Sequence, residues 1–166
     1  MLEFLEQYSY LGLFLILFIE EAGIPLPIPG DIFIGISSGL PNSNYFLIVA
    51  TVVTSTILGS TILFTLAKKI GPRLLVKYGK YIKITPQKTQ KVERWFRNYG
   101  AYAIIFGRLI PGFRTITPFV AGLFDMPYQK FYLATAVAAF IWANIYYVIG
   151  KFFAQVIEKA VLFFRQ

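Results

Sequence analysis

The sequence predicts an all-α membrane protein of two inverted repeats, each a re-entrant helical hairpin followed by a transmembrane helix. With 57% hydrophobic and 14% charged residues and a mean hydropathy of +0.62, the chain of 166 residues is too apolar for a soluble domain. Two uncharged stretches, residues 45–67 and 131–150, are each long enough to span a bilayer as a helix. A weak repeat, Ile-Pro-Gly and then a charge, occurs at residues 28–31 and 110–114. Such internal symmetry is typical of transporters.

The first repeat, about residues 8–67, begins with a short apolar run. Residues 8–19 are uncharged, but twelve helical residues rise only about 18 Å, less than the roughly 30 Å of the hydrocarbon core. Residues 23–40 follow as a predicted two-legged hairpin that dips to mid-membrane. Proline has no N–H and forces the residue before it into extended backbone, so residues 24–29 cannot form regular helix. The predicted breaks are Pro25, Pro27, Pro29 and Gly30.

A basic linker, residues 68–98, joins the repeats. Ten of the sixteen Lys and Arg residues lie between Lys68 and Arg97, with Glu93 as the one acid among them, so the formal net charge of +8 is concentrated here. Positive charge next to a membrane span is retained on the cytoplasmic side, which predicts a cytoplasmic linker in contact with lipid headgroups. No specific nucleic-acid partner is expected. Pro86 predicts the start of an amphipathic helix.

The second repeat, about residues 99–150, follows the same order. Residues 99–107 form a short apolar leg, Pro111 and Gly112 mark the break, and residues 131–150 form the second transmembrane helix. Residues 151–166 carry four charges and are expected to form an amphipathic C-terminal helix rather than another span. The whole chain is therefore expected to be a single membrane domain.

Five ionisable residues fall inside the two broken regions: Glu20, Glu21, Asp31, Arg108 and Arg114. Left unpaired at the bilayer centre, they would cost on the order of 15 kcal/mol, comparable to the stability of a whole domain. We therefore expect the hairpins to meet tip to tip, with carboxylates beside guanidinium groups in a hydrated cavity. One interpretation is a set of structural ion pairs that hold the hairpins together.

The other interpretation is a binding site for an anion. Arginine binds phosphate oxygens through two parallel hydrogen bonds, which makes Arg108 and Arg114 candidate substrate ligands. Carboxylates that titrate can couple binding to protons or to a cation such as Na⁺, which makes Glu20, Asp31 and Glu21 candidate coupling groups. The chain has neither cysteine nor histidine, so it lacks disulfides, the usual zinc ligands and the commonest general base. We expect no metal, no cofactor and no enzymatic activity.

Two motifs resemble the signatures of the DedA family, also called the SNARE-associated or VTT-domain family. The first is Glu20 with Ala22-Gly23-Ile24-Pro25 and Pro29-Gly30-Asp31; the second runs from Phe106 to Arg114 and continues in Ala121-Gly122-Leu123-Phe124-Asp125-Met126. The resemblance implies a multi-pass protein of the cell membrane with two facing re-entrant hairpins. It also implies transport of lipid phosphates, notably recycling of undecaprenyl phosphate, with lipid scrambling in eukaryotic relatives.

The family roles transfer to four positions of this chain, namely Glu20, Asp31, Arg108 and Arg114. Glu21 stands where many relatives have an amide. Other function classes remain open: an ion or proton exchanger, a lipid scramblase, a lipid-phosphate phosphatase and a structural membrane adaptor, with a homo-oligomer as a possible assembly. Ion flux without lipid phosphate would favour the exchanger, and indifference to mutation of the charged residues would favour the adaptor. The phosphatase lacks a histidine nucleophile.

Overall fold

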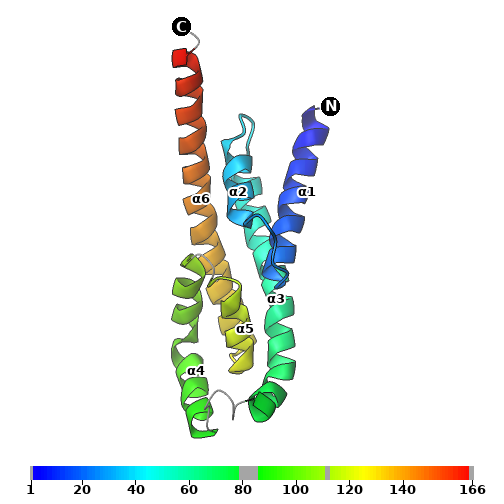
Figure 1. Ribbon diagram of the computed structural model, residues 1–166, viewed down its shortest axis with the longest axis vertical. Coiled ribbons are helices and arrows are strands. Elements are labelled where there is room, and N and C mark those ends of the chain that lie inside the picture. Colours follow the sequence, from blue (N-terminus) through cyan, green and yellow to red (C-terminus); the bar gives the residue numbers. More distant parts are fainter. Residues whose placement is uncertain (1, 79–85, 111–112, 165–166) are drawn as a thin grey trace.

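The computed structural model describes residues 2–78, 86–110 and 113–164, and within these ranges it is helical with no strand (Figure 1). The helices are α1 (Leu2–Glu21), α2 (Gly30–Gly39), α3 (Tyr45–Tyr78), α4 (Pro86–Leu109), α5 (Ile116–Leu123) and α6 (Tyr128–Phe164). Two of them, α3 and α6, are long and apolar enough to cross a membrane, over Tyr45–Gly71 and Tyr128–Ala160. The predicted all-α class is confirmed for the described residues, and α3 and α6 are candidate membrane spans by length and composition.

The remaining helices form two pairs that lie against α3 and α6. Helices α1 and α2 occupy the upper part of Figure 1, and α4 and α5 the lower part, with the connected ends of both pairs near mid-height. In the first pair, α1 packs on α3 and α2 packs on α6; in the second, α5 packs on α3 and α4 packs on α6. Each pair therefore places one helix on each of the long helices.

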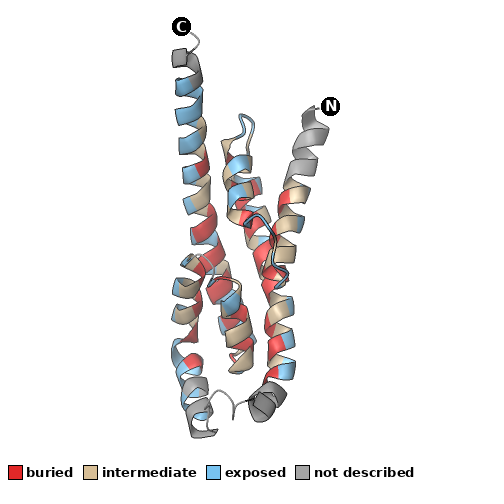
Figure 2. Ribbon diagram, in the orientation of Figure 1, coloured by how far each residue is buried: buried red, intermediate tan, exposed pale blue. Residues whose placement is uncertain are grey.

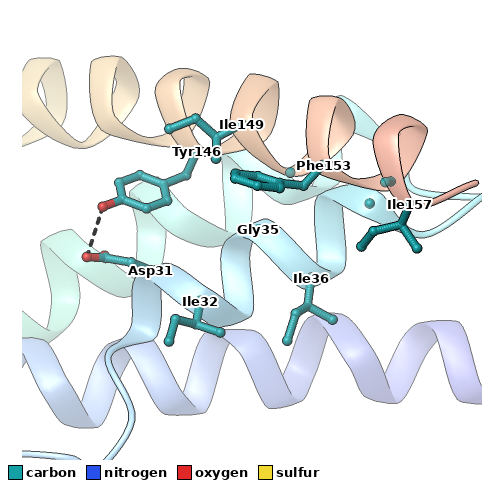
Figure 3. Close-up of a pocket in the computed structure, with 11 residues that line it drawn as sticks. Asp31, Ile32, Gly35, Ile36, Tyr146, Ile149, Phe153 and Ile157 are labelled. Carbon is teal, nitrogen blue, oxygen red and sulfur yellow. Dashed lines mark hydrogen bonds between the residues drawn. The ribbon is translucent and has the colours of Figure 1, made fainter. Parts of the chain in front are cut away.

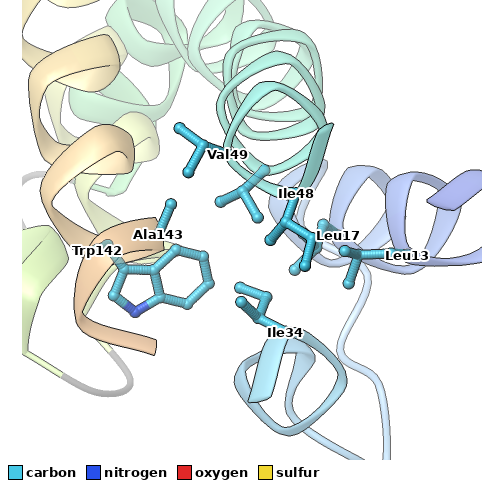
Figure 4. Packing of buried hydrophobic residues seen from close by; sticks show 8 residues of the cluster. Leu13, Leu17, Ile34, Ile48, Val49, Trp142 and Ala143 are labelled. Atoms are coloured by element: carbon cyan, nitrogen blue, oxygen red, sulfur yellow. The ribbon is translucent and has the colours of Figure 1, made fainter. Parts of the chain in front are cut away.

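Each helix pair has its own apolar core. The first core contains Leu17, Ile34 and Trp142, which converge from α1, α2 and α6 (Figure 4). The second contains Phe64 and Phe131, whose rings stack with centroids 4.0 Å apart. Figure 2 shows the buried residues on the inward faces and exposed ones on the outward faces, where many large apolar side chains lie. An apolar outer surface of this extent fits a lipid environment.

Glycines allow the closest helix contacts. A Cβ atom on Gly59 of α3 would lie 2.5 Å from the carbonyl oxygen of Phe18 and 2.8 Å from Cβ of Glu21. A Cβ on Gly122 of α5 would collide with the backbone of Phe64. Small residues at these places let helix backbones approach each other, as is common between membrane helices.

Three helices are longer than the apolar stretches that predicted them. Helix α3 continues to Tyr78 although its apolar stretch ends at residue 67, and α6 continues through the predicted separate C-terminal helix to Phe164. Helix α4 joins the predicted amphipathic segment and the short apolar leg into one element that begins at Pro86, as predicted. The reason is that lysine and arginine favour helix as well as leucine does, so charge ends an apolar span without ending the helix.

The first helix pair differs from the hairpin predicted over residues 23–40. The pair consists of α1 and α2, so residues 23–40 supply only the turn and the second helix. Helix α1 ends where Gly23 takes a φ of 95°, a conformation that glycine adopts without strain. The N–H groups of Gly23 and Ile24 donate to the carbonyl oxygens of Glu20 and Ile19, which is the Schellman pattern of helix termination.

We predict that Gly59→Ala lowers the thermal stability of the protein in detergent. The added methyl group would push α1 away from α3, and overpacking of this kind costs about 1–3 kcal/mol. Gly12→Ala is the matched control, because a Cβ atom on Gly12 would meet no atom within 4 Å. Thermal unfolding should show a lower Tm for Gly59→Ala and an equal or slightly higher Tm for Gly12→Ala. Equal Tm values for the two variants would contradict the close packing at Gly59.

Candidate functional site

The five charged residues singled out by sequence meet in one place, which we call the charged cluster: Glu20, Glu21, Asp31, Arg108 and Arg114. The two glutamates end α1, and Asp31 lies in the first turn of α2. Arg108 lies in the last turn of α4, and Arg114 comes just before α5. The cluster thus joins the connected ends of the two helix pairs, across more than 80 positions of sequence.

Arg114 is the centre of the cluster. Its Nη1 donates to Oδ1 of Asp31 at 2.5 Å, and its Nη2 lies 2.5 Å from Oε1 of Glu20. The guanidinium carbon lies 4.2 Å from the ring centroid of Trp142 on α6, a cation–π distance. Only 5% of Arg114 is exposed. Two carboxylates and one aromatic face therefore hold this cation in a fixed orientation.

Arg108 and Glu21 form a second, more deeply buried pair. Arg108 Nη2 lies 2.5 Å from Glu21 Oε2, and the side chains are 3% and 1% exposed. Within the described part of the chain, Nη1 of Arg108 has no hydrogen-bond partner, and neither has the hydroxyl of Thr56. Both residues line a cavity of about 10 Å³. That volume is the size of one water molecule and is too small for a phosphate group.

Glu20 has a second contact, with the start of α2. The N–H of Gly30 donates to Glu20 Oε2 at 2.9 Å, so the carboxylate accepts one of the unpaired donors at the helix N-terminus. Gly30 leaves room for this contact, because a Cβ atom there would collide with Glu20 and with Leu17. The predicted breaks Pro25, Pro27 and Pro29 lie in the non-helical backbone between α1 and α2.

The second predicted break, Pro111 and Gly112, lies outside the described residues. On either side of it, α4 ends at Leu109 and α5 begins at Ile116. The hydroxyl of Thr117 donates to the carbonyl oxygen of Arg114 at 2.9 Å, which fixes the backbone that carries this arginine.

Two residues of α6 complete the site and were not among the predicted site residues. The hydroxyl of Tyr146 donates to Asp31 Oδ2 at 3.2 Å (Figure 3), and Trp142 lies over Arg114. They stand four positions apart, on one face of the helix. A tryptophan and a tyrosine at this spacing, within a stretch otherwise rich in alanine, are the sequence signal that points to them.

The charges of the cluster do not cancel. Three carboxylates face two guanidinium groups, so the cluster carries one net negative charge when every member is ionised. Among the described residues, no group of acidic side chains has the arrangement of a metal site. An anion that binds here would therefore have to compete with the carboxylates for Arg108 and Arg114.

Comparison with known proteins gives a consistent set of relatives. The family model for the VTT domain matches residues 28–152. The uncharacterized membrane protein YbfM of Bacillus subtilis is 30% identical over 152 residues, which cover 90% of this chain and 93% of YbfM. Protein DedA of Escherichia coli K12 is 27% identical over 163 residues, 93% of this chain and 74% of DedA. No solved structure matches the chain significantly.

Two kinds of functional name occur among the relatives. Undecaprenyl phosphate transporter A of Bacillus subtilis is 28% identical over 153 residues, 90% of this chain and 74% of the transporter. A protein of Lactococcus lactis with the name alkaline phosphatase-like protein is 26% identical over 157 residues, 90% of this chain and 72% of that protein. The family match extends over most of the sequence and includes Asp31, Arg108 and Arg114 of the charged cluster, whereas Glu20 and Glu21 lie just before it. The chain therefore belongs to the VTT-domain, or DedA, family of membrane proteins.

Proposed function

We propose that the protein is a transporter that moves a lipid phosphate across the cell membrane, with a polyprenyl phosphate such as undecaprenyl phosphate as its substrate. The observation that carries the proposal is the pair of buried arginines at the meeting point of the hairpins, 4% and 5% exposed. Guanidinium groups in such a place suit a phosphate group, which accepts two parallel hydrogen bonds. The relatives named undecaprenyl phosphate transporter A support the choice of lipid.

The depth of the cluster supports transport across the bilayer. Gly59, which touches Glu21, lies near the centre of the apolar span Tyr45–Gly71. Tyr146, which contacts Asp31, lies near the centre of Tyr128–Ala160. Charged side chains are expensive at this depth, and where they occur they commonly line a pathway for a substrate or an ion.

The predicted inverted repeat is part of the proposal. An inverted repeat makes α1, α2 and α3 equivalent to α4, α5 and α6. The contact of α1 with α3 then corresponds to that of α4 with α6, and the contact of α2 with α6 corresponds to that of α5 with α3. All four contacts are present, which supports re-entrant hairpins that enter from opposite faces. In this arrangement the basic linker, residues 68–98, faces the cytoplasm.

Coupling follows from the net charge of the cluster. Glu20 and Asp31 already hold Arg114, so a phosphate gains access to the guanidinium group only when a carboxylate releases it. Protonation of one carboxylate, or its neutralisation by a cation, releases the arginine and removes the repulsion between the phosphate and the cluster. Transport of the lipid phosphate is therefore accompanied by a proton or a cation.

The two arginines have different surroundings, and we assign them different roles. The side chains of Glu20 and Asp31 are 13% and 18% exposed, whereas the side chain of Glu21 is 1% exposed. Arg114 contacts the phosphate directly, in exchange for Glu20 or Asp31. Arg108 stays bound to Glu21, and its Nη1, which has no hydrogen-bond partner among the described residues, becomes a further donor only where the small cavity beside it widens. Glu21 therefore has a structural role, as the partner of Arg108, in addition to its proposed role as a coupling group.

The alternatives use parts of the same site. An ion or proton exchanger needs the carboxylates but no phosphate, and a scramblase needs no coupling. A phosphatase is favoured only by the names of the Lactococcus lactis relatives. The chain has no histidine or cysteine nucleophile, and the hydroxyl of Thr117 donates to a backbone carbonyl. A homo-oligomer is compatible with each of these functions.

We predict that Arg114→Lys weakens binding of polyprenyl phosphate about tenfold or more. Lysine retains the charge but loses the planar pair of donors, so charge and geometry are tested separately. Binding and translocation are measured in liposomes with protein shown to be folded. Lys130→Arg is the control: it exchanges lysine for arginine at a position outside the charged cluster and should leave binding unchanged. Near-normal binding by both Arg114→Lys and Arg108→Lys would leave structural ion pairs as the better account of the arginines.

We predict that translocation by the wild-type protein slows as pH rises, because fewer carboxylates are then protonated. Asp31→Asn imitates the protonated form permanently and should flatten the pH profile, as should Glu20→Gln. The measurement is the initial rate of translocation in liposomes over a series of pH values. If both variants retain the wild-type rate and pH profile, neither acid is a coupling group.

We predict that Glu21→Gln destabilises the protein more than Glu20→Gln does. Removing one partner from a buried ion pair typically costs about 3–5 kcal/mol, because the other charge stays buried alone. Among the described residues, Arg108 forms an ion pair only with Glu21, whereas Arg114 retains Asp31 when Glu20 is neutralised. Thermal unfolding in detergent compares the two variants. An equal loss of Tm would show that the two pairs do not differ in this way.

A further inference from the structure

An apolar groove leads away from the charged cluster along α2 and α6 (Figure 3). Its volume is about 430 Å³, within the range of ligand sites. Asp31 and Tyr146 stand at one end of the groove and are joined by their hydrogen bond. The remaining lining consists of glycine, alanine, isoleucine and phenylalanine: Ile32, Gly35, Ile36, Gly39, Ile149, Gly150, Phe153, Ala154 and Ile157.

The groove is continuous with the site through Asp31. One carboxylate oxygen of Asp31 accepts from Arg114, and the other accepts from Tyr146 in the groove wall. A molecule with its charged end at Arg114 would therefore have its next atoms at the mouth of the groove. Farther along, the groove walls are open on one side, where Ile36 is 59% exposed and Ile157 is 61% exposed.

Gly35 keeps the groove open. Glycine is less favourable than alanine inside a helix, so a helical glycine often has a packing reason. Gly150 has such a reason, since a Cβ atom there would collide with the backbone of Gly35. A Cβ atom on Gly35 itself would meet nothing within 4 Å, and Gly35 lines the groove. The missing side chain at this position leaves the groove unfilled.

We propose that this groove binds the hydrocarbon chain of the transported lipid, a single-chain polyprenyl monophosphate, while its phosphate lies at Arg114. The proposal rests on the lipid-phosphate transport proposed above and adds where the chain of the substrate is held. The polar end of the groove lies at the cluster and its apolar length points away from it, which is the polarity of such a lipid. During transport the chain then stays in apolar surroundings while the phosphate is at the cluster.

The size of the groove favours one chain. A volume of about 430 Å³ lies near the lower end of the range of ligand sites, which is about 300–1,000 Å³, so the groove holds part of one long chain rather than a whole lipid. The first part of one long chain fills it, and the rest leaves through the open side into the bilayer. A phospholipid with two chains would place only one of them in the groove. A single-chain lipid phosphate therefore matches the site better.

The test is photo-crosslinking in liposomes with the full chain and a polyprenyl phosphate that carries a diazirine near the phosphate end of its chain. In the wild-type protein, the label should attach to Ile36 and Phe153 in preference to Phe46, which is exposed on α3 outside the groove. Gly35→Leu should reduce labelling of the groove about tenfold. Gly12→Leu is the matched control, because Gly12 also has open space around its Cβ position, and its labelling should stay within about twofold of wild type.

A second variant fills the groove from the opposite helix. Ile157→Trp changes an exposed lining residue of α6 and should reduce labelling in the same way without disturbing the contact of α2 with Gly150. Retained labelling of the groove in both filled variants, or equal labelling of Phe46 and Phe153, would overturn the proposal. So would equal labelling by a diazirine analogue of phosphatidic acid, since the groove would then not select a single chain.

Translocation measured in the same liposomes separates the two proposals. If Gly35→Leu translocates the lipid as fast as the wild type and the groove of the wild type is not labelled, the chain site is overturned and the proposed function stands. A labelled groove in a protein that translocates no lipid phosphate would support the chain site and contradict the proposed function. Loss of both labelling and transport in Gly35→Leu, with Gly12→Leu normal, supports both.

Discussion

The structure depends on the burial of charge inside an apolar helical protein. Arg114 has to find carboxylates because water is excluded around it, and those carboxylates come from the other helix pair. Since an unpaired charge at such a depth costs several kcal/mol, the two pairs cannot separate without replacing each lost partner. The ion pairs therefore fix how the halves of the chain meet, while the glycine contacts with α3 and α6 fix how closely each half packs.

The sequence predicts the cluster well because charges and prolines are rare in apolar stretches. Glu20, Asp31 and Arg114 stand out for that reason, and their meeting follows from the need for partners. Which carboxylate meets which arginine depends on helix orientation, which the one-dimensional pattern does not contain. The deep burial of Glu21 and Arg108 relative to Glu20 and Asp31 likewise becomes visible only once α3 and α6 are in place.

Other features were beyond the sequence for different physical reasons. Apolar length measures the part of a helix that suits a bilayer, whereas helix length depends on backbone propensity, so the ends of α3 and α6 were placed too early. Tyr146 was missed because an aromatic residue in an apolar helix resembles a core residue until its hydroxyl partner is known. The groove was missed because it forms between α2 and α6 only once the two helices pack together, and because it depends on the absence of a side chain at Gly35.

The double contact of Glu20 links chemistry to movement. Its Oε1 faces Arg114, and its Oε2 accepts the N–H of Gly30, so one carboxylate joins the end of α1, the start of α2 and the segment before α5. Removal of the negative charge of Glu20 would weaken both attachments at once, because hydrogen bonds to a neutral acceptor are weaker than those to a carboxylate. The proline-containing turn between the helices would then lose a polar restraint together with the contact to Arg114. The charge at this one position therefore bears on the mechanical freedom of the first helix pair as well as on the charge of the cluster.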